Sequence, residues 1–88
     1  MLVIMNQRKK ITPEIIGANI RRLRTDRGET QQQLAGFLGY GVSTVANYES
    51  GYRLPDLVTF LRIAFHYEAS LEDFVADIEF RDESVHDS

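Results

Sequence analysis

The stretch from Gln31 to Ser50 constrains the fold more than any other feature of this sequence. Its fifth residue is Ala35, its ninth is Gly39 and its fifteenth is Val45. Two short helices that cross steeply need this set, because Ala35 permits close approach, Gly39 lets the chain reverse and Val45 fills the angle. Apolar residues stand at the fourth, eighth, tenth and eighteenth places: Leu34, Leu38, Tyr40 and Tyr48. The spaced set predicts two short helices joined by a tight turn.

Helix start and stop signals place further helices on both sides of this stretch. The run Thr12-Pro13-Glu14 is typical of a helix start, and Gly28 is expected to end that helix. Thr30, with Gln33 three residues later, predicts a capping box at the next helix. Asp56 and Ser70 are expected to cap a fourth and a fifth helix. The fold class predicted is therefore all-α, a compact bundle of five helices.

Length and composition indicate a single domain. The chain has 88 residues and no cysteine, which excludes a disulfide framework and a thiolate metal site. We expect an N-terminal arm at 1–11, the helical domain at 12–77 and an acidic C-terminal tail at 78–88. Leu2, Val3 and Ile4 in the arm either add to a sheet edge or pack on a partner. No apolar run approaches the roughly 20 residues of a membrane span, so we expect a soluble, cytoplasmic protein.

Charge is divided unevenly along the chain, although the net charge is only −3. Residues 1–53 carry eight basic and four acidic residues, a balance of +4, whereas residues 54–88 carry two and nine, a balance of −7. A basic front and an acidic rear would orient the molecule on a polyanion. The alternative is an ordinary soluble protein with uneven charge. The run Arg8-Lys9-Lys10 is likewise either a solvated tail or a flexible arm that contacts phosphates.

Taken together, these motifs resemble the Cro and phage-repressor type of helix-turn-helix protein, also called the XRE family. The resemblance runs without a gap from about Ile16 to Phe74. It includes Gly28 to Ala35, Leu38-Gly39, Ser43-Thr44-Val45, Tyr48 to Gly51, and Ser70 to Phe74. The resemblance implies a five-helix DNA-binding domain. It also implies a transcriptional regulator, a repressor in our interpretation, that binds a two-fold operator in double-stranded DNA as a homodimer.

The resemblance also implies which residues would read bases in the major groove. Asn47 is the best direct reader, because a carboxamide bonds adenine N6 and N7 together. Val42 and Ala46 offer only apolar contact, where relatives often have Arg, Lys or Gln. Recognition of the shape of the DNA is therefore expected to matter more than direct contacts with bases. The full base-reading set is Val42, Ser43, Thr44, Ala46 and Asn47.

Phosphate contacts and one ion pair follow from the same resemblance. The expected phosphate-binding residues are Gln31, Ser50, Tyr52 and Arg53. Tyr52 stands where relatives often have Lys, so one charge is missing. Glu49 is expected to pair with Arg24 of the first helix in a structural ion pair. Glu68 stands where a glycine often ends the fourth helix.

The predicted fourth helix carries more apolar residues than one buried face needs. Its inner side is expected to consist of Leu57, Phe60, Ile63, Ala64 and Tyr67. Val58, Leu61 and Phe65 then form a second apolar stripe. Because a soluble monomer rarely exposes such a stripe, we expect a homodimer interface there. The alternative is that the C-terminal tail folds back and covers it.

No other chemistry is indicated. Tyr40 and Tyr48 are expected in the core, and His66 and His86 are too far apart and too lightly accompanied for a metal site. The sequence offers no nucleophile with a convincing base and no phosphate-cradling glycine loop, so we expect no enzyme, no cofactor and no metal. The second function considered is a protein-interaction module on the same fold, which binds a toxin, a peptide or another regulator.

Overall fold

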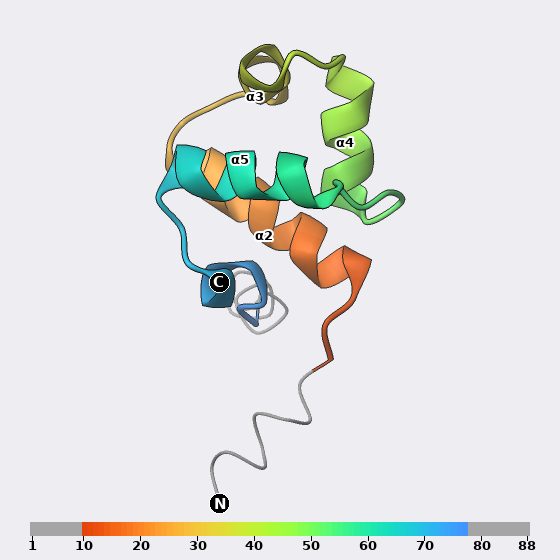
Figure 1. The fold of residues 1–88 in the computed structure, drawn as a ribbon, viewed down its shortest axis with the longest axis vertical. Helices are drawn as coiled ribbons and strands as arrows, with labels where there is room; N and C mark the ends of the chain where they lie inside the picture. The colour runs from red at the N-terminus through yellow and green to blue at the C-terminus, as the bar shows by residue number, and fades with distance from the viewer. Residues whose placement is uncertain (1–9, 78–88) are drawn as a thin grey trace, which may run out of the picture.

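The computed structural model describes residues 10–77, which form four α-helices and one short 3-10 helix. In chain order they are α2 (Pro13–Asp26), α3 (Gln31–Leu38), α4 (Val42–Ser50), α5 (Leu57–Tyr67) and the 3-10 helix η1 (Leu71–Phe74), labelled as in Figure 1. No strand occurs in this part of the chain, so the all-α prediction is confirmed there. Most of the expected arm and all of the expected acidic tail lie outside the described residues.

The predicted helix boundaries from Thr12 to Asp56 are confirmed by their caps. The Thr12 hydroxyl accepts from the Ile15 N–H at 3.2 Å. Thr30 and Gln33 form both bonds of a capping box, at 3.0 and 2.8 Å. The Asp56 carboxylate accepts from the Thr59 N–H at 2.8 Å. These are contacts within one helical turn, and they satisfy N–H groups that the helix itself leaves unpaired.

The prediction of a fifth α-helix is wrong, because the chain forms only the four-residue η1 after Ser70. The start signal is present, since the Ser70 N–H donates to the Asp73 carboxylate at 2.8 Å. The carbonyls that would continue the helix are engaged by α2 instead. Arg22 donates to the Asp73 carbonyl at 2.7 Å, and Asn19 donates to the carbonyls of Phe74 and Ala76 at 3.0 and 3.1 Å. Tertiary hydrogen bonds thus fix this segment against α2.

The hydrophobic core lies where all five elements meet. Its buried members are Ile20, Leu34, Ala35, Leu38, Val45, Tyr48, Ile63, Tyr67 and Phe74. In Figure 1, α5 lies across α2, while α3 and α4 stand on the opposite side of α5 from η1. The inner residues expected for α3 and α4 are therefore confirmed.

Two of the residues expected in the core are not there. Leu57 is 70% exposed, and Thr59 takes an inner place on α5 at 2% exposure. At about 100° per residue, Leu57 lies about 120° around the helix from Ile63, which puts it on the outer side. Tyr40 is 41% exposed, and its hydroxyl lies 3.0 Å from the Thr59 hydroxyl. Four of the five expected inner residues of α5 do pack in or against the core: Phe60, Ile63, Ala64 and Tyr67.

Three helices, α3, α4 and α5, end at residues with left-handed backbone angles, which are Gly39, Gly51 and Glu68. Gly39 ends α3 with φ 79°, as predicted for the turn. Glu68 ends α5 with φ 54°, at the position where the sequence lacks the glycine that is often found there. A residue with a side chain is strained in this conformation, so the end of α5 is held by the contacts around it.

Gly17 sets how closely α2 and α4 approach each other. A Cβ atom at Gly17 would overlap the Tyr48 carbonyl oxygen and lie 2.8 Å from the Glu49 carbonyl oxygen. Both atoms belong to the backbone of α4, so neither can move aside as a flexible side chain would. The glycine is what allows α2 to pack directly on α4.

Gly17→Ala is expected to destabilise the fold by on the order of 3 kcal/mol, because the added methyl group forces the two helices apart. Gly36→Ala is the matched control, since a Cβ there meets nothing within 4 Å. It is expected to stabilise the protein by about 0.5 to 1 kcal/mol through helix propensity. Urea unfolding followed by circular dichroism measures both changes, and equal effects at the two glycines would contradict the close packing.

Candidate nucleic-acid interface

α3 and α4 form the steeply crossed pair that the sequence predicts. Figure 1 shows α3 almost along its axis while α4 runs down the side of the molecule, with a short turn between them. The turn consists of Gly39, Tyr40 and Gly41, and the Gly39 N–H donates to the Ala35 carbonyl at 2.8 Å. Val45 is fully buried beneath the turn. This geometry defines a helix-turn-helix unit.

The second helix of the unit presents the residues that were predicted to read bases. Val42 and Ser43 are exposed, and Thr44, Ala46 and Asn47 are half-buried. None of the five is among the buried residues, whereas Val45, Tyr48 and Glu49 of the same helix are buried. Within residues 10–77, the Asn47 side-chain amide has no hydrogen-bond partner, so its donors and its acceptor are available to a ligand.

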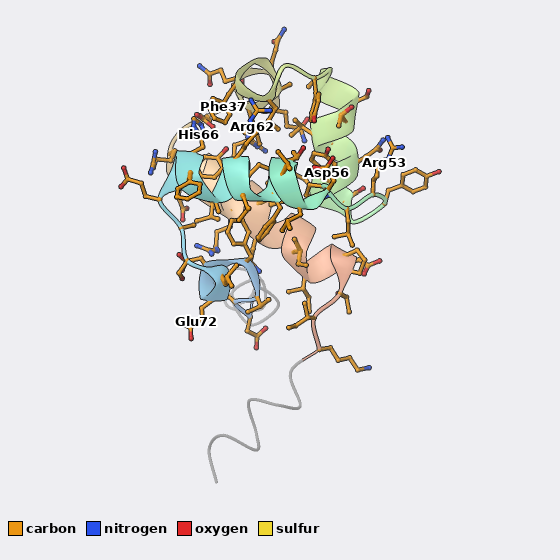
Figure 2. All side chains as sticks on the ribbon, viewed as in Figure 1. Phe37, Arg53, Asp56, Arg62, His66 and Glu72 are labelled. Carbon is orange, nitrogen blue, oxygen red and sulfur yellow. The ribbon has the colours of Figure 1, made fainter. Side chains whose placement is uncertain are left out.

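The predicted phosphate-binding residues lie in different local settings. Tyr52 is 83% exposed and Arg53 is exposed, and Figure 2 shows Arg53 pointing outward beyond the end of α4. Ser50 is also exposed, but its hydroxyl donates to the Asn47 carbonyl and accepts from the Tyr52 N–H, both at 3.2 Å. In this conformation Ser50 has no donor left for a phosphate, while Arg53 keeps its full guanidinium.

Gln31, the first residue of α3, is joined to the second helix by its side chain. Its amide nitrogen donates to a Glu49 carboxylate oxygen at 3.0 Å. A carboxylate accepts but cannot donate, so this contact fixes which end of the Gln31 amide faces Glu49. The second amide hydrogen of Gln31 and the backbone N–H groups of Gln31 and Gln32 remain for an anion at the helix N-terminus.

Arg24 and Glu49 form a buried, two-pronged ion pair between α2 and α4. Arg24 Nε and Nη2 donate to the two Glu49 oxygens at 2.6 and 3.0 Å, and Arg24 Nη1 donates to the Glu29 carbonyl at 2.6 Å. The hydrogen bond to Glu49 raises the pKa of Arg24 against the opposing effect of burial. Glu49 is therefore used inside the fold, and it does not face a nucleic acid as a free negative charge.

Several of the cations in the first half of the sequence are also engaged within the fold. Arg22 lies 3.6 Å from the Asp26 carboxylate, and Arg27 donates to the Tyr67 carbonyl at 3.0 Å. Arg21 and Arg53 are exposed and form no ion pair with another described residue. The positive charge offered to a polyanion is thus smaller than the count for residues 1–53 suggests.

Two polar clusters in the fold were not predicted from the sequence. Asn19 is fully buried and donates to the carbonyls of Phe74, at the end of η1, and Ala76, and a polar residue beside Ile20 on the inner face was its visible signal. Glu29 accepts from the Tyr67 hydroxyl at 2.7 Å and pairs with His66 at 2.8 Å. Burial raises the pKa of Glu29, but these two hydrogen bonds outweigh it, so the pKa falls below its ordinary value.

Within residues 10–77, no three His, Cys, Asp or Glu residues are arranged to hold a metal ion. None of the helices in the same range combines the length and apolar character needed to cross a membrane.

Comparison with known proteins gives the same class as the geometry. The family described as "Helix-turn-helix domain" matches residues 15–76, which is well over half of the chain. The chain therefore belongs to this helix-turn-helix family, in agreement with the resemblance to Cro and phage repressors.

Individual relatives are regulators. The chain is 32% identical over 65 residues to the cryptic phage CTXphi transcriptional repressor RstR of Vibrio cholerae, covering 74% of this chain and 59% of RstR. It is 33% identical over 57 residues to the HTH-type transcriptional regulator ImmR of Bacillus subtilis (strain 168), covering 65% and 45%. The chain thus spans less than two thirds of either regulator's length.

A solved structure with a similar fold is that of the restriction-modification controller protein C.AhdI from Aeromonas hydrophila. The two structures agree with a TM-score of 0.63 and 31% sequence identity. The match covers 70% of this chain and 94% of C.AhdI.

Glu49→Gln is expected to destabilise the protein by about 3 kcal/mol, because it leaves the Arg24 charge buried without its counter-charge. Glu72→Gln is the control, since it removes the same charge from an exposed position and is expected to change stability by less than about 0.5 kcal/mol. Urea unfolding at neutral pH measures both. If the two variants lose the same small amount, the ion pair does not stabilise the fold.

Proposed function

We propose that this chain is a sequence-specific, double-stranded DNA-binding transcriptional regulator that represses by occupying a two-fold operator as a homodimer. The observation that carries the proposal is the outer face of α4. The side chains of Ser43, Thr44 and Asn47 on that face are free of internal partners, and the nearby α3 N-terminus retains unpaired N–H groups. The match to a helix-turn-helix family and to two transcriptional regulators supports the same function.

In this proposal α4 lies in the major groove and reads bases through Asn47, with Ser43 and Thr44 beside it. Val42, which is 47% exposed, contributes apolar contact with a thymine methyl group, and Ala46 does the same. Gln31 at the start of α3 and Arg53 after the end of α4 hold phosphates beside the groove. Because few cations of residues 10–77 are free of internal partners, the affinity for DNA is expected to depend only modestly on salt concentration.

The outer side of α5 supports the homodimer. Val58, Leu61 and Phe65, predicted as a second stripe, are 68%, 42% and 80% exposed. Leu57 extends the same side at 70% exposure. We define these four residues as the α5 apolar face. Four large apolar side chains on one helix form a patch of the kind that marks an interface, and two copies of a short helix can bury it against each other.

One observation favours the second candidate, a protein-interaction module. The α5 apolar face belongs to the part of the sequence, residues 54–88, that carries the balance of −7. An apolar and basic partner segment would complement it. In that case the outer face of α4 would be unused, and the protein would bind a partner without binding DNA.

The test of DNA reading is selection of bound duplexes from a random pool at fixed low salt. Wild type is expected to enrich a palindrome. Asn47→Ala is expected to lose about 1 to 3 kcal/mol of discrimination at one base pair in each half-site, because the bidentate contact is gone. Arg53→Ala is expected to weaken binding to all DNA sequences alike. It is also expected to reduce, by about 1, the slope of log affinity against log salt concentration.

Leu71→Ala is the control for both variants, since Leu71 is 69% exposed on η1, away from α3 and α4. It is expected to enrich the same palindrome with unchanged affinity. No enrichment by folded wild type, together with capture of one stoichiometric protein, would replace the proposal with the interaction module.

Phe65→Glu is expected to convert the homodimer to a monomer, because it places a charge on the most exposed residue of the α5 apolar face. Leu71→Glu is the matched control, with an equally exposed apolar residue outside that face. Sedimentation equilibrium at micromolar concentration measures the mass of each. A wild type that sediments only as the 10.1 kDa chain contradicts the homodimer.

A further inference from the structure

One side of α5 carries three polar residues that reach the helix-turn-helix unit. Thr59, Arg62 and His66 follow one another at spacings of three and four residues, so they line the same side of the helix. The Thr59 hydroxyl lies 3.0 Å from that of Tyr40 in the turn. His66 pairs with Glu29 just before α3, and Arg62 reaches the end of α3.

Arg62 makes the contact that holds the last turn of α3. Its Nη1 donates to the Leu38 carbonyl at 3.2 Å, and its Nη2 donates to the Phe37 carbonyl at 3.1 Å. The guanidinium also lies 5.5 Å from the centre of the Phe37 ring. His66 stacks on the same ring at 4.1 Å with an interplanar angle of 20°. Figure 2 shows Phe37, Arg62 and His66 gathered between α3 and α5.

These contacts suit arginine in particular. Two carbonyl oxygens at a helix C-terminus are partly negative and have no hydrogen-bond partner within the helix. A guanidinium group can donate one hydrogen bond to each of them. Lysine keeps the charge, but it is a point donor that neither spans two carbonyls in one plane nor stacks on a ring in the same way. Arg62 and Lys at this position therefore differ in geometry and not in charge.

The position of this contact links two surfaces. Leu38 is the last residue of α3, and the turn that leads into α4 begins at Gly39. Arg62 thus fixes α3 immediately before the chain enters the helix that reads DNA in the proposed function. On the outer side of the same helix α5 lies the apolar face through which we expect the dimer to form. A single helix therefore carries both the dimer surface and the attachment of the reading unit.

We propose that Arg62 is a positioning residue that fixes the orientation of α3 and α4 relative to the α5 apolar face, and so sets which half-site spacing the dimer accepts. This inference rests on the proposed function, because spacing has meaning only for a dimer on DNA. In a two-fold dimer the same freedom of α4 occurs in both copies, so a small loss of order broadens the range of separations between the two recognition helices.

The orientation itself is tested without DNA, by residual dipolar couplings of backbone amides in the full chain. In wild type, one alignment tensor is expected to fit α2, α3 and α5 together. In Arg62→Met the couplings of α3 are expected to depart from that tensor, while those of α2 and α5 still fit. Arg62→Lys is expected to resemble Arg62→Met, because its charge alone does not clamp two carbonyls.

Arg27→Met is the matched control. Arg27 also donates to a carbonyl at a helix end, that of Tyr67 at 3.0 Å, and lies 5.8 Å from an aromatic ring centre. It joins α2 to α5 and does not contact α3. The variant has the same change in charge, and its α3 couplings are expected to fit the wild-type tensor.

The consequence for DNA is tested with two selected half-sites placed at a series of spacings. Wild type is expected to lose about tenfold in affinity when the spacing changes by one base pair, and Arg62→Met and Arg62→Lys are expected to lose only about twofold. Arg27→Met is expected to keep the wild-type preference. If Arg62→Met does not fold, the spacing preference of Arg62→Lys is compared with that of wild type instead.

Wild-type couplings or spacing preference in both Arg62 variants would overturn the inference, as would a rescue of the spacing preference by Lys, which would reduce Arg62 to its charge. A wild type that binds no duplex at any spacing would overturn the proposed function and the spacing role together. In that case the couplings still decide whether Arg62 orients α3.

Discussion

A single buried carboxylate, that of Glu49, joins the three helices on which the rest of the structure depends. It receives two bonds from Arg24 of α2 and one from Gln31 of α3, while it belongs itself to α4. Taking two charges out of water costs several kcal/mol, which is recovered only when every oxygen and donor is well paired. That condition holds at this site, where no buried side-chain nitrogen or oxygen in the described residues lacks a partner. These contacts therefore join α2, α3 and α4 around one carboxylate.

The parts of the fold that the sequence predicted are those determined within one or two turns of chain. The caps at Thr12, Thr30 and Asp56 are local, as is the left-handed Gly39, so residue type and spacing were sufficient. The parts that were missed depend on distant partners. η1 stops where α2 engages the carbonyls of Asp73 and Phe74, and Tyr40 stays half-exposed because its hydroxyl lies against that of Thr59. Which residues of α4 face outward could be predicted from the spacing of its apolar residues. The hydrogen bond between Gln31 and Glu49 could not be predicted, because it depends on how α3 and α4 are packed.

The two halves of the proposed function occupy separate surfaces of the same small domain. The outer face of α4 carries Ser43, Thr44 and Asn47, which are not buried, and the outer side of α5 carries exposed apolar side chains. Within residues 10–77, four of the seven cations are engaged by other parts of the fold: Arg22, Arg24, Arg27 and Arg62. Because few cations remain free in these residues, the proposed function relies for its selectivity on shape and on a few polar contacts.

The most direct test of this account is a titration of isotope-labelled protein with a selected duplex, followed by backbone and side-chain amide NMR. If α4 is the reading helix, the largest shifts are expected at the Asn47 side-chain amide, at the N-terminus of α3 around Gln31, and at Arg53. The signals of η1 and of the Asn19 side-chain amide are expected to remain unchanged. Shifts confined to α5 and η1, or no shifts on α4 at saturating duplex, would contradict the claim that α4 is the reading helix.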